Sequence, residues 1–115
     1  MPTALDEDRV DAVFRALSDP TRRDIVRRLS AAEATVTELA EPYAMSVQAV
    51  SQHLQVLERC GLVSRGRHRQ SRPCRLEPAA LSAAAGWLEE SRRQWSQRTD
   101  RLETHLAGLQ ERDEQ

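Results

Sequence analysis

The stretch MSVQAVSQHLQVLERCGLV, residues 45–63, constrains the fold of this chain more than any other. Val47, Val50, Leu54 and Leu57 recur at a spacing that places them on one side of an α-helix, as in a helix that packs against a core. The opposite side is polar but uncharged, whereas solvated helix faces are commonly rich in Glu and Lys. Amides, hydroxyls and small methyl groups can contact the edges of DNA bases without the repulsion that an acidic face would meet at phosphates. We therefore predict a surface that reads a polyanion, formed by Gln48, Ala49, Ser51, Gln52 and Gln55.

The distribution of charge supports this prediction, although the net charge of the 115-residue chain is only −1. Residues 46–76 contain six arginines and one acidic residue, Glu58, so this segment carries +5 and the remainder of the chain is acidic. Concentrated positive charge is typical of a phosphate-binding surface. The alternative interpretation is a solvated basic loop without a partner.

Three helices are predicted before this stretch, and the first two are joined by a short turn. The first is marked by apolar residues at helical spacing, Val10, Val13, Phe14 and Leu17. Residues 18–20, Ser-Asp-Pro, should end it. Asp19 is then suited to cap the second helix, with Pro20 at the first helical position. The inward side of that second helix is formed by Ile25, Val26 and Leu29.

A third short helix and a turn should lead into the quoted stretch. Thr37 can cap a helix over residues 38–43. Ser46 is expected to cap the next helix, and Gly61 to end it, because glycine adopts the left-handed conformation at little cost. We call this helix, at about residues 46–60, the reading helix.

Two short extended runs follow the reading helix, at residues 62–66 and 72–76, around a polar tip at 68–71. Such runs predict a small antiparallel hairpin. Pro73 has no N–H to donate to a ladder, so its strand should lie at an edge. The hairpin is expected over about residues 62–77.

The last helix is predicted from Pro78 to about Gln110, with residues 111–115 disordered. Leucine or tryptophan recurs every seventh residue along it, at Leu81, Leu88, Trp95, Leu102 and Leu109. A heptad seam that persists over four repeats normally pairs with another helix, which favours self-association. The alternative, a helix lying on the core of its own domain, suits its first two turns.

These elements together predict a mostly α fold with a small β-hairpin, a winged helix-turn-helix, as one domain over residues 1–110. In that arrangement the second helix of the pair lies in the major groove of DNA. The basic hairpin, the wing, reaches along the duplex toward phosphates or a narrow minor groove. Its candidate contacts are Arg65, Arg67, His68, Arg69 and Arg72.

Three runs of this chain resemble the ArsR family of bacterial winged-helix repressors. They are FRALSDPTRRDIVRRL (14–29), TVTELAEPYAMSVQAVSQHLQVLERCGLVSRGR (35–67) and WLEESRRQWSQRTDRLETHL (87–106), which together cover most of the chain. The resemblance implies a homodimer that forms through its first and last helices, represses promoters, and dissociates when an inducer binds. The identity of that inducer is not implied.

The resemblance also implies roles for individual residues. It places Ser46, Gln48, Ala49, Ser51, Gln52 and His53 at the recognition positions of the reading helix, and Arg67 and Arg69 in the wing. The predicted dimer interface comprises Val10, Val13, Phe14, Leu17, Leu81, Leu88, Trp95, Leu102, Leu106 and Leu109.

The chain departs from the metal-sensing branch of this family. That branch carries a Cys-x-Cys pair before the reading helix, or paired Asp, His and Glu ligands on the last helix. Here residues 37–41 contain no thiol or imidazole, and the last helix offers only His105 beside Asp100 and Glu103. We therefore predict no metal site and no cofactor. A second departure is Pro73-Cys74, where relatives usually have two aromatic residues.

Cys60 and Cys74 allow two interpretations. Each can be a small apolar core residue. Alternatively, neighbouring arginines could lower the pKa of a thiol and create a redox or arsenical switch. Two cysteines are too few for a disulfide framework and fit a reducing compartment.

The remaining composition limits the class of protein. The N-terminus lacks a signal-like apolar run and the chain lacks a spanning segment, so we expect a cytoplasmic protein without a membrane partner. No nucleophile constellation, carboxylate pair or glycine-rich phosphate loop is present, so an enzyme is not expected. The prediction is a repressor that binds a pseudo-palindromic operator in double-stranded DNA. Two alternatives stay open: a thiol- or metal-responsive sensor of the same fold, and a protein-interaction module that uses the last helix.

Overall fold

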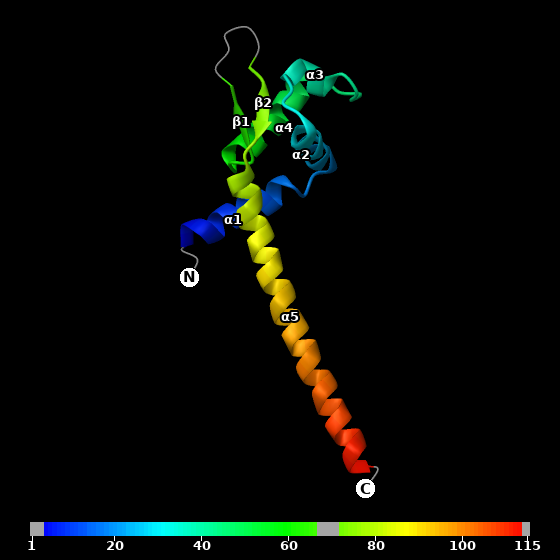
Figure 1. Ribbon diagram of the computed structural model, residues 1–115. Coiled ribbons are helices and arrows are strands. Elements are labelled where there is room, and N and C mark those ends of the chain that lie inside the picture. Colours follow the sequence, from blue (N-terminus) through cyan, green and yellow to red (C-terminus); the bar gives the residue numbers. More distant parts are fainter. Residues whose placement is uncertain (1–3, 67–71, 114–115) are drawn as a thin grey trace. The chain divides into compact units, whose positions relative to one another are not determined.

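The computed structural model describes residues 4–66 and 72–113 (Figure 1). Within these ranges the elements are α1 (Ala4–Ala16), α2 (Pro20–Ala31), α3 (Val36–Ala40), α4 (Val47–Arg59), β1 (Val63–Arg65), β2 (Cys74–Leu76) and α5 (Pro78–Asp113). The predicted mostly α fold with one small hairpin is confirmed. Contacts divide the chain into two units, residues 1–84 and 85–115, and this boundary lies inside the single domain expected over 1–110.

The junction between α1 and α2 is built as the sequence predicted. Asp19 has extended backbone angles, φ −93° and ψ 131°, and its carboxylate accepts a hydrogen bond from the backbone N–H of Arg22 at 3.0 Å. Pro20 follows in the first turn of α2, where its missing N–H removes no helical bond. The hydroxyl of Ser18 donates to the carbonyl oxygen of Arg15 at 2.6 Å, which helps to end α1.

The start and end of α3 were predicted wrongly. Thr35, not Thr37, is the N-cap: its hydroxyl accepts from the backbone N–H of Glu38, and the Glu38 carboxylate accepts from the N–H of Thr35, each at 3.2 Å. This reciprocal capping box satisfies two backbone donors, whereas a cap at Thr37 would satisfy one. The helix then ends at Ala40 and leaves a longer turn before α4.

Helix α4 begins after Ser46, whose hydroxyl accepts from the N–H of Ala49 at 3.1 Å. Val50, Leu54 and Leu57 are fully buried, but Val47 is 49% exposed, so its predicted place in the core is wrong. Because a helix turns about 100° per residue, Val47 lies at the edge of the stripe that the other three share. Gly61 follows α4 with φ 83°, as expected for a glycine that ends a helix.

The hairpin is shorter than the extended runs predicted from the sequence. Strands β1 and β2 pair antiparallel, with Val63 opposite Leu76 and Arg65 opposite Cys74. Cys74 also pairs on its other side with Ala34: its N–H donates to the Ala34 carbonyl oxygen at 2.7 Å. The carbonyl oxygen of Pro73 accepts from the N–H of Gly66 at 2.8 Å. At Cys74, however, β2 is not the edge strand that the sequence predicted, because Ala34 pairs with its other side.

The core of the first unit lies between α1, α2, α3, α4, the hairpin and the start of α5. Its buried members are Val13, Ala16, Ile25, Val26, Leu29, Leu39, Ala40, Val50, Leu54, Leu57, Cys60, Leu62, Val63, Cys74, Ala80 and Ala84. Small alanines on the first turns of α5 therefore pack on the core of their own domain. This matches the alternative that the sequence allowed for those turns.

In the second unit, α5 continues to Asp113, beyond the end predicted at Gln110. The expected disorder is thus wrong for residues 111–113, and residues 114–115 lie outside the described ranges. Ion pairs spaced three residues apart, Arg92 with Glu89 and Arg93 with Glu90, favour the helical conformation on this exposed segment. Among the described helices none is both long enough and apolar enough to span a membrane.

Candidate nucleic-acid interface

Helix α3 and the turn after it are fastened to α2 by Arg28. The guanidinium of Arg28 donates to the carbonyl oxygens of Leu39 at 2.8 Å and Glu38 at 3.2 Å, so it caps the last turn of α3. The same guanidinium lies 5.4 Å from the ring centroid of Tyr43, within the range of a cation–π contact. The Tyr43 hydroxyl in turn donates to the carboxylate of Asp24. These contacts fix the turn that sets the direction of α4.

The outward face of α4 carries the polar residues that the sequence singled out. Ser46, Gln48, Gln52 and Gln55 are exposed, and Ala49 and Ser51 are half-buried. Helix α4 holds Glu58 and Arg59 as its formally charged residues, and both lie in its last turn. The first two turns therefore present amides, hydroxyls and methyl groups that can approach base edges.

Val47 belongs to this surface and was missed from the sequence. It is the one large hydrophobic residue among residues 7–66 and 72–84 that is exposed, and it occupies the first position of α4. Residues at the start of a recognition helix are those that contact base edges. In the sequence, the one indication that Val47 is exposed was its position at the edge of the apolar stripe of α4.

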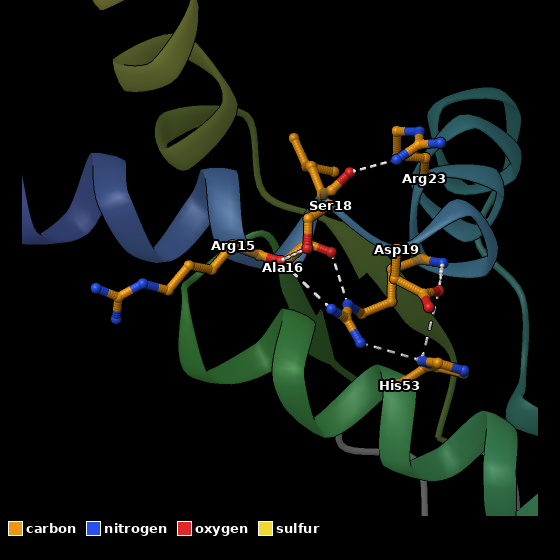
Figure 2. A network of polar contacts seen from close by, with 8 residues as sticks. Arg15, Ala16, Ser18, Asp19, Arg23 and His53 are labelled. Atoms are coloured by element: carbon orange, nitrogen blue, oxygen red, sulfur yellow. Dashed lines mark hydrogen bonds and ion pairs between the residues drawn. The ribbon is translucent and has the colours of Figure 1, made fainter.

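His53 is turned away from the exposed residues of α4. Its side chain is 23% exposed and its Nδ1 lies 3.4 Å from a guanidinium nitrogen of Arg22 and 3.9 Å from the carboxylate of Asp19 (Figure 2). The structure thus brings His53 together with the α1–α2 junction rather than with Gln48 and Gln52. Arg22 was not singled out from the sequence, because its partner lies 31 residues further along the chain.

The base of the wing is bonded to α4. Arg65 on β1 forms an ion pair with Glu58, and the two side chains are 24% and 34% exposed. Arg72 is exposed, as is Arg75, which pairs with Glu77 at 3.4 Å. Arg67, His68 and Arg69 lie outside the described residues. Arg65 is therefore partly neutralised and holds the wing in place.

Both cysteines are buried free thiols, Cys60 at 7% and Cys74 at 0% exposed. The Cys60 thiol donates to the Leu57 carbonyl oxygen at 3.3 Å. Burial raises the pKa of the Cys74 thiol, and the charge of Arg65 opposes this only in part. A reactive thiol needs access and a lowered pKa, so this geometry favours the interpretation as small core residues.

The described residues contain no group of three or more His, Cys, Asp or Glu side chains arranged to hold a metal ion. His105, Asp100 and Glu103 are exposed on α5.

The residues predicted for a dimer interface fall into three sets. Val10 and Val13 are buried in the subunit itself, at 8% and 0% exposed, so their side chains have almost no surface left for a partner. Phe14, Leu17 and Leu81 are half-buried against the same core. The predicted interface residues of the second unit are all exposed: Leu88, Trp95, Leu102, Leu106 and Leu109.

Comparison with known proteins agrees with this geometry. A helix-turn-helix domain family matches residues 17–65. The transcriptional repressor SdpR of Bacillus subtilis (strain 168) is 33% identical over 76 residues, which span 66% of this chain and 84% of SdpR.

The fold is shared with solved structures of ArsR-type regulators. An ArsR-like transcriptional regulator from Rhodococcus sp. RHA1 is 32% identical, with a TM-score of 0.73 over 84% of this chain and 91% of the regulator. The homodimeric winged helix-turn-helix DNA-binding domain of Mb0332 from Mycobacterium bovis, a possible ArsR-family regulator, is 27% identical. It aligns with a TM-score of 0.60 over 76% of this chain and 82% of that domain. The chain belongs to the ArsR family of winged helix-turn-helix transcriptional regulators.

Proposed function

We propose that this protein acts as a homodimer that binds a pseudo-palindromic operator and represses transcription from it. The observation that carries the proposal is the uncharged, exposed face of α4, held at the end of a helix-turn-helix by the contacts of Arg28. An acidic or densely basic face would serve solubility or non-specific attraction, whereas amides and methyl groups discriminate between bases. SdpR is a transcriptional repressor, which supports the same direction of control here.

Individual contacts follow from the chemistry of α4. Gln48 and Gln52 are one turn apart and exposed, and a glutamine amide can donate to N7 and accept from N6 of adenine at the same time. Val47 and Ala49 supply apolar surface for the methyl group of thymine. Ser46, Ser51 and Gln55 complete the surface.

Phosphate contacts are assigned to the wing. Arg72 is exposed beside β2, and Arg67 and Arg69 lie in the segment between the strands. Each arginine that neutralises a phosphate should steepen the log–log dependence of affinity on salt by about 0.9. Arg65 instead supports the wing through Glu58.

Dimerisation is assigned to the half-buried apolar residues Phe14, Leu17 and Leu81 and to the exposed apolar residues of α5. Three exposed leucines and Trp95 at heptad spacing favour pairing with a second helix. The homodimeric state of the Mb0332 domain supports this assignment. We place the dimer in the cytoplasm, without enzymatic activity, and under the control of an inducer of unknown identity.

The test is a titration of the purified protein against its own upstream DNA and a scrambled duplex of equal length, by fluorescence anisotropy at two salt concentrations. A preference of about 10³ or more for the upstream DNA, with a steep salt dependence, is the expected result. If the upstream DNA binds no better, selection from random duplexes follows. Failure of that selection to enrich any sequence would refute operator binding and favour the protein-interaction module.

A further inference from the structure

One guanidinium connects three helices at the α1–α2 junction. The Nε–H of Arg22 donates to the carbonyl oxygen of Ala16 at 2.6 Å, and its Nη2 donates to that of Arg15 at 3.3 Å (Figure 2). Both carbonyls belong to the last turn of α1, where helical N–H partners are missing. The carbonyl of Arg15 also accepts from the backbone N–H and the hydroxyl of Ser18, at 3.2 and 2.6 Å. The remaining nitrogen, Nη1, lies 3.4 Å from Nδ1 of His53 on α4. Arg22 itself is on α2, so it links α1, α2 and α4.

The chemistry of these groups fixes the roles of the imidazole nitrogens. A guanidinium can only donate, so a hydrogen bond between Arg22 and Nδ1 of His53 requires Nδ1 to accept and places the proton of a neutral ring on Nε2. The carboxylate of Asp19 is 3.9 Å from Nδ1, which is too long for a hydrogen bond. That carboxylate already accepts the backbone N–H of Arg22 at 3.0 Å.

These contacts separate His53 from the residues that face outward on α4. Its side chain is 23% exposed, and its one hydrogen bond described in residues 4–66 and 72–113 runs inward, to Arg22. We propose that His53 is a positioning residue, which fixes the angle of the reading helix against the α1–α2 junction and does not contact a base. This inference rests on the proposed function, because the angle of α4 matters only if α4 enters a groove.

A positioning residue and a base contact differ in what their loss does to recognition. If His53 sets the placement of α4, its removal misplaces every contact of that helix together and weakens all operators by a similar factor. If His53 contacted a base, the loss would concentrate at one base pair and relax discrimination there.

Three variants distinguish the role of Nδ1 of His53 from that of Nε2. His53→Asn keeps an acceptor oxygen near the place of Nδ1, His53→Gln puts its amide near the place of Nε2, and His53→Ala removes both. Affinity for the operator and for its single-base-pair variants is measured by anisotropy, at concentrations of active protein fixed by stoichiometric titration. We expect His53→Asn to bind within about twofold of the parent protein. His53→Gln and His53→Ala should lose about threefold to tenfold on every operator, the range of one partly buried hydrogen bond.

Either of two results overturns the proposal. Rescue by Gln but not by Asn, or a loss confined to one base pair, would make His53 a base contact through Nε2. Binding equal to the parent in all three variants would show that the contact with Arg22 does not position α4.

A second measurement uses the parent protein alone, without DNA and without any substitution. A long-range proton–nitrogen correlation spectrum of the parent protein at mildly alkaline pH assigns the tautomer of His53. A ring protonated at Nε2 is expected, and a proton on Nδ1 would refute acceptance from Arg22. If the parent protein discriminates no operator at all, the proposed function fails, while the tautomer still decides whether the contact exists.

Discussion

Truncation of Val47 to alanine tests whether the first turn of α4 contacts thymine. Full burial of a valine side chain is worth about 1.5–3 kcal/mol, and Val47 is 49% exposed in the free protein. DNA can therefore cover about half of this side chain, which limits its contribution to the binding free energy to about 0.8–1.5 kcal/mol. We expect a loss of about 1 kcal/mol, or roughly fivefold in Kd, on the preferred operator.

The thymine methyl group provides the matched perturbation on the DNA. Each thymine of the operator is replaced in turn by deoxyuridine, which lacks only that methyl group, and binding of the parent and of Val47→Ala is measured by anisotropy. At the contacted position the two losses should not add, so Val47→Ala binds both duplexes alike. Additive losses at every thymine would refute the contact.

Two protein variants serve as controls, one for the apolar contact with DNA and one for stability. Val47→Thr keeps one methyl group and the volume, so it should retain most of the affinity for the operator. Val50→Ala removes a fully buried side chain one turn further along α4, and it should instead cost about 2 kcal/mol in the free energy of unfolding. Val47→Ala should change that free energy by less than about 0.5 kcal/mol.

Four further results are expected. Gln52→Ala should cost about 1–3 kcal/mol at the preferred base pair and relax discrimination there; an equal loss on all operators in anisotropy titrations would contradict this. Arg67→Ala should weaken all duplexes and flatten the log–log salt dependence by about 0.9, and an unchanged slope would remove Arg67 from the phosphate contacts. Trp95→Asp should yield monomers in sedimentation, whereas an intact dimer would contradict the heptad assignment. Asp19→Ala should cost about 1 kcal/mol in stability at neutral pH, because its carboxylate caps α2. The pKa of Asp19 is lowered, first by the backbone N–H of Arg22, so the contribution of its charge is present above its ordinary pKa and disappears as pH falls through the lower folded value. In urea unfolding, Asp19→Asn, which keeps a capping oxygen, should therefore converge with the parent only in strong acid. The deficit of Asp19→Ala should shrink there without disappearing, because the protonated carboxyl still accepts; a deficit that grows on acidification would refute the sign.

Features that depend on neighbours in sequence were predictable. Asp19, Ser46 and Gly61 act within one turn of their own positions, and each was placed correctly. The error at Thr35 was of the same local kind, because Thr35 and Glu38 have the spacing of a capping box.

Features that depend on packing were not predictable in this way. The exposure of Val47 follows from how α4 is rotated on the core, which a stripe of apolar residues fixes only to within one position. The bond between Arg22 and His53 joins residues 31 apart, and no spacing rule connects them. The pairing of Cys74 with Ala34 also joins residues far apart in the chain, so the second neighbour of β2 could not be derived from spacing.

The short length of α3 has a consequence for chimaeric regulators. Five residues are too few for a helix to persist by itself, since nucleation costs more than so few backbone bonds return. Its last carbonyls depend on Arg28, and the turn after it depends on Tyr43 reaching Asp24. A graft that moves only residues 35–60 into another scaffold would leave both anchors behind. An exchange of DNA specificity between such proteins should therefore either carry α2 along or replace only the outward side chains of α4.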